Sequence, residues 1–236
     1  MNQPDPSIPA LAWTAFWSAT TIGLYAVSKA AHRRWPHLWL SPLVFTPVVL
    51  IALALAMHES YAQYIRSTHW LVMLLGPATV AFAVPIYEQR NTIRRYWPAL
   101  AIGVAAGSSA AMSSAWALAS LLSLDGNLRL SLLPRSVSTP FAMTISADIG
   151  GVPDLTAVFV IVTGVFGVML GEAILRFLPL KSPLARGALF GMGAHGAGVA
   201  RANQIGDQEG TIAGLVMVLV GLVNVLAAPL VGMLLR

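Results

Sequence analysis

Apolar residues run through the chain in eight stretches separated by short polar segments. Most of these stretches approach twenty residues, the length that an α-helix needs to cross the hydrocarbon core of a bilayer. The pattern therefore predicts membrane-spanning helices. Their approximate bounds are Ala10–Ser28, Leu38–Met57, His69–Tyr87, Pro98–Leu124, Leu128–Ser146, Leu155–Leu178, Leu184–Ala200 and Thr211–Leu235.

One of these stretches, Leu128–Ser146, contains features that a straight membrane helix lacks. Pro134 and Pro140 interrupt it, and Arg135 lies between them. Lipid tolerates irregular polar backbone only where protein or a water-filled cavity covers it. We therefore predict a broken or re-entrant segment at this place.

The composition supports a membrane protein. Of the 236 residues, 57% are hydrophobic and only 10% are charged, whereas soluble domains have about 25% charged residues. The mean hydropathy is +0.73. We predict an all-α polytopic membrane protein of about seven to eight transmembrane segments, with residues 1–236 forming a single integral membrane domain.

The basic residues predict the orientation of the chain. Nine of the fourteen Lys and Arg form three clusters between apolar stretches, as in cytoplasmic loops. All three clusters lie on one side only if a segment between Pro98 and Leu178 does not cross, and Leu128–Ser146 is the obvious choice. This predicts about seven crossings, with the N-terminus outside and the C-terminus cytoplasmic; the alternative has eight crossings and both termini on one side. The clusters are Lys29, Arg33 and Arg34; Arg90, Arg94 and Arg95; and Arg176, Lys181 and Arg186.

Several classes of function have no residues to support them. No basic groove interleaved with aromatic residues indicates nucleic-acid binding. The chain has no cysteine, and neither a P-loop nor a Gly-x-Ser-x-Gly elbow is present. His58 and Glu59 lack the second histidine that a zinc-binding helix needs. We predict no metal, no cofactor and no enzymatic activity.

A weak internal similarity relates two proline-bounded stretches. Residues 74–85 and 132–140 both begin with Leu-Leu and contain two prolines, and helices beginning at Pro98 and near Pro153 follow them. Unwound segments at matching places in two halves indicate a transporter binding site. Prolines are, however, simply common in membrane helices.

Arg135 is the first candidate for a functional residue. A buried arginine is costly unless a partner or water compensates, so we interpret it as a cation for a substrate carboxylate. Ser136, Ser138 and Thr139 would donate hydrogen bonds beside it, and the N-termini of half-helices would add exposed N–H groups. The alternative is an arginine that snorkels to the interface or pairs with Asp148.

His195 lies in a run, residues 191–198, that is too rich in glycine for a straight helix. Such backbone allows a ligand or another segment to come close. We interpret His195 as a proton carrier or a hydrogen-bond partner of the substrate. The alternative is a buried histidine that is satisfied by a backbone carbonyl.

Two further residues lie beside the proline-bounded stretch of the third segment. Thr79 follows the break at Pro77, and Tyr87 ends the segment. We expect both to line the same cavity from the other half of the protein. Tyr87 fits equally well as an aromatic residue at the membrane interface, which is the commoner case.

The remaining charges of the C-terminal half suggest ordinary roles. Glu172 and Arg176 are four residues apart on a predicted helix, and we expect them to pair with each other. Arg201, Asp207 and Glu209 flank the last loop, where we expect solvated side chains. The glycine stripe before Glu172, residues 164, 167 and 171, predicts close helix packing.

At these residues the chain resembles the LrgB/CidB family. The matching stretches cover roughly the last two-thirds of the chain, in the same order. Val199 departs from the pattern, which usually has threonine there, and Arg135 replaces the commoner lysine. The stretches are residues 76–87, 134–140 and 150–153, the run from Ala194 to Arg201, and Glu209 with Gly210.

The resemblance implies two different kinds of activity in a bacterial plasma membrane. Bacterial members are described as holin/antiholin-like modulators of murein hydrolases and cell lysis, with a small LrgA/CidA-type partner. Plant relatives are plastidial glycolate/glycerate translocators, and some bacterial members look like carriers of related carboxylates. We also expect a homo-oligomer.

The residues themselves favour transport over lysis control. A holin has no use for an intramembrane arginine with three hydroxyls, whereas a carboxylate carrier does, since arginine matches carboxylate geometry. We therefore predict a secondary carrier of glycolate, glycerate, lactate or a similar 2-hydroxycarboxylate, with His195 as the proton-linked group. The alternatives are a holin/antiholin-like regulator and a purely structural subunit for an LrgA-type partner.

Overall fold

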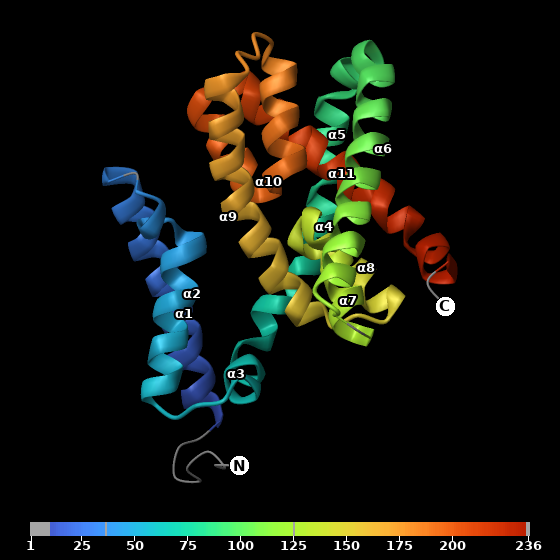
Figure 1. The fold of residues 1–236 in the computed structure, drawn as a ribbon. Helices are drawn as coiled ribbons and strands as arrows, with labels where there is room; N and C mark the ends of the chain where they lie inside the picture. Colours follow the sequence, from blue (N-terminus) through green and yellow to red (C-terminus); the bar gives the residue numbers. More distant parts are fainter. Residues whose placement is uncertain (1–9, 36, 125, 235–236) are drawn as a thin grey trace. The chain divides into compact units, whose positions relative to one another are not determined.

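The computed structural model describes residues 10–35, 37–124 and 126–234, whose regular secondary structure is entirely helical (Figure 1). The predicted all-α class is thereby confirmed. The chain forms two compact units, residues 1–77 and 78–236, with the boundary inside the short helix α4 (Leu75–Ala81). The single membrane domain stays a prediction.

The first unit contains α1 (Ala10–Arg34), the 3-10 turn η1 (Leu38–Leu40), α2 (Pro42–Ala56) and α3 (Tyr61–Met73). Local sequence explains where the later helices begin. Proline is favoured in a first turn, where its missing N–H costs nothing, and Pro42 takes that place in α2. Ser60 and Gln63 form a capping box at the start of α3. Trp17, which is 1% exposed, forms the centre of this unit.

Four stretches of the described residues are long and apolar enough to cross a membrane. They are Tyr61–Glu88, Arg90–Leu121, Pro153–Phe177 and Asp207–Met233. The first consists of α3, α4 and α5 (Ala83–Glu88), so this segment is broken, as its prolines predict. The chain is thus a multi-pass helical membrane protein, and its number of crossings stays a prediction.

Three long helices form the frame of the second unit. They are α6 (Arg90–Leu121), α9 (Pro153–Phe177) and α11 (Asp207–Leu234). In Figure 1, α6 runs from the top of the unit to its lower end, and α9 returns to the top. The basic clusters at the start of α6 and after the end of α9 therefore lie at the same end, as the charge pattern predicts.

Between α6 and α9 the chain turns back on itself within the second unit. We call this segment the proline hairpin (residues 126–149). It consists of α7 (Gly126–Leu132), the 3-10 turn η2 (Leu133–Ser136) and α8 (Thr139–Ile149). The chain after α8 returns to the end of α7, because the Val152 N–H donates to Ser131 Oγ at 2.8 Å. The predicted broken, re-entrant segment is therefore present.

Helix α10 (Pro183–Ile205) also turns back, at His195, where the backbone is not helical. A Cβ on Gly198 would collide with the Phe190 carbonyl, although residues eight apart in a straight α-helix are separated by about 12 Å. Residues 183–194 and 196–205 thus lie side by side and form the histidine hairpin. The sequence predicts a single helix here, whereas the glycines let the two halves of the segment pack against each other. Its crossing of the membrane stays a prediction.

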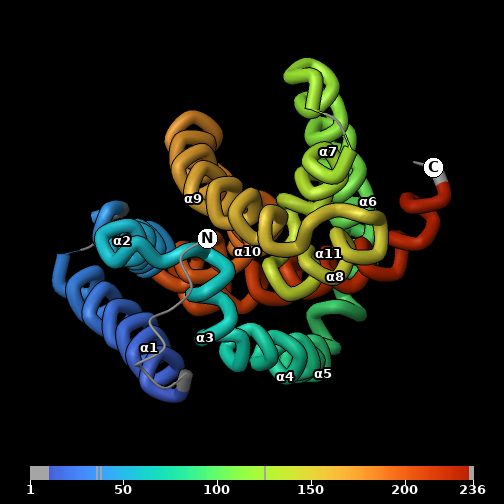
Figure 2. Tube along the Cα trace, turned by 90° about the horizontal axis from the view of Figure 1, so that it is seen from below, coloured from blue at the N-terminus to red at the C-terminus, as the bar shows by residue number. Residues whose placement is uncertain are grey.

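The two hairpins belong to an inverted repeat. Residues 126–177 and 183–234 have equal length, and each contains a hairpin followed by a long helix. Helix α11 starts beside the base of α10, where Glu209 meets Gly187, and ends beside Ile149 of α8. It therefore runs antiparallel to α9 and lies along α8 (Figure 2).

This repeat corrects two predictions. Its halves are adjacent, whereas the proline pattern matched residues 74–85 with 132–140. Within the second unit, the end of α11 lies opposite the basic clusters at the start of α6 and at the end of α9, because α10 folds back on itself. The prediction placed the C-terminus on the side of these clusters.

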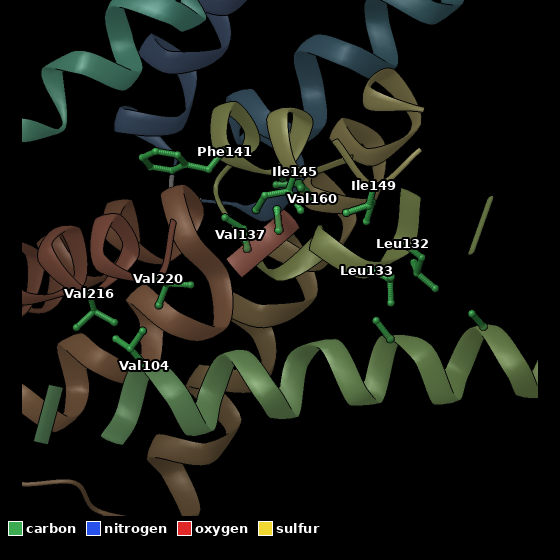
Figure 3. Packing of buried hydrophobic residues seen from close by; sticks show 14 of the residues in the cluster. Val104, Leu132, Leu133, Val137, Phe141, Ile145, Ile149, Val160, Val216 and Val220 are labelled. Atoms are coloured by element: carbon green, nitrogen blue, oxygen red, sulfur yellow. The ribbon is translucent and has the colours of Figure 1, made fainter. Parts of the chain in front are cut away.

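Apolar side chains fix the proline hairpin in the second unit. Leu132 and Leu133 point towards α6, and Phe141 and Ile145 lie on α8 within the same buried cluster (Figure 3). All four are less than a tenth exposed. The position of η2 is therefore set by packing on both sides of the proline break.

Candidate functional site

The tips of the two hairpins meet inside the second unit. The 3-10 turn η2 lies against α6, α9 and α10, and the His195 imidazole contacts the backbone of Arg135. Arg135 and His195 are sixty positions apart in the sequence, yet each lies at a point where a helix is interrupted. The structure thus brings together the two residues that the sequence singled out.

Two serines hold the Arg135 side chain. Its Nη1 donates to Ser136 Oγ at 3.3 Å and its Nη2 donates to Ser114 Oγ of α6 at 3.1 Å. Within the described part of the chain, no carboxylate lies within ion-pair distance of Arg135, and Asp148 is exposed. The alternative pairing with Asp148 is therefore wrong.

Three buried polar atoms at the tips have no hydrogen-bond partner: Arg135 Nε, Ser138 Oγ and His195 Nε2. Ser138 and His195 are 6% and 3% exposed. Buried polar groups are normally paired, and each exception needs an explanation, such as the binding of a ligand. A small polar molecule between the tips would supply the missing partners.

The backbone around these atoms favours a negative charge. Helix α8 begins directly after Ser138, whose side chain does not cap it. In its first turn, Pro140 has no N–H, and the Thr139 and Phe141 N–H groups lie at the tip. The second half of α10 begins beside His195. Helix N-termini attract anions through these N–H groups and the helix dipole.

His195 has a backbone conformation that histidine rarely adopts. Its φ is 40° and its ψ is −122°, and such strain persists only where the surroundings enforce it. Gly164 of α9 lies beside the ring, since a Cβ there would be in van der Waals contact with His195 Cε1, at 3.6 Å. Backbone strain of this kind occurs most often at functional sites.

The other predicted site residues lie in different places. Thr139 is half-buried at the start of α8, next to the tip. Thr79 is half-buried on α4, and Tyr87 is 69% exposed on α5, with its ring centroid 4.5 Å from the Arg90 guanidinium. Neither Thr79 nor Tyr87 belongs to the two tips, and their place in a shared cavity stays a prediction.

The hydroxyls that support the site were not predicted from the sequence. Thr156 Oγ1 donates to the Ser131 carbonyl at 2.9 Å and shares a second hydrogen bond with the Ser146 hydroxyl at 2.7 Å, and all three residues are buried. They close the base of the proline hairpin. Ser114 was missed too, although it follows Gly107 and Ala111 in a stripe of small residues, which predicts a helix face that packs.

The ion pairs of the C-terminal half differ from the prediction. Glu172 pairs with Arg201 of α10 at 2.7 Å, while Arg176 is exposed. Glu209 is buried and pairs with Arg186 at 2.8 Å. Because α10 folds back, Arg201 reaches Glu172, and the predicted pair of Glu172 with Arg176 is wrong, as is the solvated state of Glu209.

A hollow of about 340 Å³ adjoins the first half of the histidine hairpin. Its wall consists of glycine and apolar residues from α6, α10 and α11, so it offers no polar partner to an anion. The polar atoms between the tips are the better candidate site. The described residues contain no group of three His, Cys, Asp or Glu that would hold a metal ion. The residues of the wall are Ala99, Leu100, Gly103, Val104, Ala188, Leu189, Met192, Gly193 and Val216.

Comparison with known proteins gives a consistent assignment. The model of the LrgB-like family matches residues 21–234. The chain is 39% identical to the uncharacterized protein YwbG of Bacillus subtilis, over 89% of this chain and 93% of the relative. It is 35% identical to the antiholin-like protein LrgB of the same organism, over 79% and 83%. No solved structure matches the chain. The family model covers both halves of the inverted repeat, and the chain belongs to the LrgB-like family.

Proposed function

We propose that the protein is a secondary carrier of small 2-hydroxycarboxylates such as glycolate, glycerate or lactate. The observation that carries this proposal is the meeting of two half-helix tips that contain unpartnered buried polar atoms. Discontinuous helices of inverted repeats form the substrate sites of many transporters, with helix N-termini directed at anionic groups. The architecture of the second unit has this form.

The roles of the residues follow from their chemistry. The Arg135 guanidinium would neutralise the substrate carboxylate, since charge-assisted hydrogen bonds are the strongest available. Ser138 and Thr139 would contact the same carboxylate or the 2-hydroxyl. His195 would accept or donate a proton through Nε2, which fits a proton-linked step. Ser136 would hold the guanidinium.

The proposed orientation follows from the basic clusters. We place these clusters on the cytoplasmic side of a bacterial plasma membrane and the N-terminus outside. The return of α10 then puts the end of α11 outside as well. A homo-oligomer and a small LrgA/CidA-type partner remain part of the proposal. Because the chain has no cysteine, single introduced cysteines and an impermeant thiol reagent would test both ends.

Uptake of labelled glycolate into proteoliposomes tests the transport function. The wild type should take up glycolate with saturation, and Arg135→Gln should lose at least about tenfold in rate, because it removes the charge from the anion site. Arg176→Gln, an exposed arginine of α9, is the matched control and should transport like the wild type. Wild-type uptake by Arg135→Gln would contradict the anchor role.

The name of the antiholin-like relative favours a second candidate. In this alternative the protein regulates murein hydrolases and cell lysis in a holin/antiholin-like manner, with an LrgA-type partner. Dye-loaded vesicles separate the two functions. Release of large dyes without saturable glycolate uptake would support the holin-like function and contradict the carrier.

A further inference from the structure

Ser114 of α6 is the only residue outside the hairpins, among the described residues, that is hydrogen-bonded to the Arg135 side chain. The Ser136 contact comes from the neighbouring residue of the same turn. An arginine side chain has several rotatable bonds and loses considerable freedom when it is fixed. A partner on a different, long helix restricts the guanidinium much more than a sequence neighbour does.

The hydrogen bonds of Ser114 restrict it to one role. Its Oγ donates to the Ala111 carbonyl of its own helix at 2.9 Å, so the hydroxyl proton is used. The same oxygen accepts from Arg135 Nη2. Ser114 therefore presents only an acceptor to the site, and an acceptor repels a carboxylate but attracts a guanidinium.

The result is a guanidinium with one defined free edge. Ser136 and Ser114 each engage one terminal nitrogen, whereas Nε is buried without a partner. The nearby unpartnered atoms are Ser138 Oγ and His195 Nε2. A carboxylate needs the N–H groups of arginine at a fixed angle to bind through two hydrogen bonds.

We propose that Ser114 is a positioning residue, which holds the Arg135 guanidinium so that its Nε edge faces a carboxylate between the two hairpin tips. This inference rests on the proposed carrier function. Ser114 determines how well the substrate is bound, and it takes no part in the movement of the substrate across the membrane.

Kinetics of glycolate uptake in proteoliposomes tests this role with Ser114→Ala. We expect KM to rise about tenfold, as for the loss of one hydrogen bond to a charged group, while Vmax stays within about twofold. Ser114 is exposed, so the variant should fold like the wild type, and its unfolding temperature checks this. Ser114→Thr keeps the oxygen and should restore KM.

Ser113→Ala is the matched control, because Ser113 is the exposed neighbour on the same helix. The structure gives its hydroxyl no hydrogen bond. An unchanged KM in Ser114→Ala, or an equal rise in Ser113→Ala, would overturn the inference while leaving the carrier intact. Absence of saturable uptake by the wild type would overturn the carrier function and this inference together.

Discussion

The two hairpins of the inverted repeat reach the same point in the molecule, but different chemistry holds each of them. The base of the proline hairpin is closed by buried hydroxyls, with Thr156 bonded to Ser131 and Ser146. The histidine hairpin is held by close glycine contacts and by two ion pairs, Arg186 with Glu209 and Arg201 with Glu172.

The two hairpins also differ in the residues that interrupt the helix at the tip. Around Arg135, Pro134 follows the end of α7 and Pro140 lies in the first turn of α8. Proline removes a backbone donor and clashes with the preceding turn, so no helix continues through either position. At His195 no proline is present, and the turn depends on a strained residue between glycines. The comparison teaches that a sequence can specify a hairpin in two ways. Prolines can interrupt the helix, or glycines can allow two helical halves to pack closely against each other.

A side chain added at a closely packed glycine should cause the largest loss of stability. In Gly198→Ala the new Cβ would collide with the Phe190 carbonyl, and backbone cannot move aside as a flexible side chain can. We expect a loss of about 3 kcal/mol or more in stability. Gly196→Ala is the control, since no atom lies within 4 Å of its Cβ position. Unfolding in detergent, followed by circular dichroism, measures both. Equal stability of the two variants would contradict the packed hairpin.

Removing the Thr156 hydroxyl, which closes the proline hairpin, should cause a smaller loss of stability. Thr156→Val keeps the shape but removes the hydrogen-bond partner of the Ser131 carbonyl and of the Ser146 hydroxyl. A buried group left unpaired costs about 1–3 kcal/mol. Thr163→Val on the same helix, where the structure gives the hydroxyl no bond, should change stability far less. Chemical unfolding gives the free energy of unfolding of both variants. Equal losses would contradict the stabilising role of the hydroxyl cluster.

The two ion pairs of the histidine hairpin should contribute differently to stability. Glu209 is buried, with 8% of its side chain exposed, whereas the Glu172 side chain is 39% exposed. We expect Glu209→Gln to cost about 1–2 kcal/mol and Glu172→Gln less than about 1 kcal/mol, because water screens exposed pairs. Thermal unfolding at low and high salt measures both. A larger loss for Glu172→Gln would reverse this ranking.

Much of the proline hairpin was predictable from sequence. Pro134, Pro140 and Arg135 lie within one apolar stretch, and each local signal indicates a break. The placement of the basic clusters on one side also required a segment that does not cross. Local sequence and global charge agreed, and the structure has this hairpin.

The histidine hairpin was only half predictable. The glycine run showed that the helix around His195 is not straight, but the fold-back depends on contacts between Gly198 and Phe190, and between Gly187 and α11. Such contacts join residues that are distant along the helix, so periodicity does not reveal them. The pair of Glu172 with Arg201 was missed for this reason, since it forms only after the fold-back.

A double-mutant cycle for glycolate binding tests the central claim most directly, with one change at each tip. Ser138→Ala alters the proline hairpin and His195→Gln alters the histidine hairpin, and calorimetric titration gives the binding free energy of each variant. If both tips contact one carboxylate, each change weakens binding and the double mutant departs from additivity by at least about 0.5 kcal/mol. Strictly additive effects, or glycolate affinity unchanged by both substitutions, would contradict a single anion site between the hairpins.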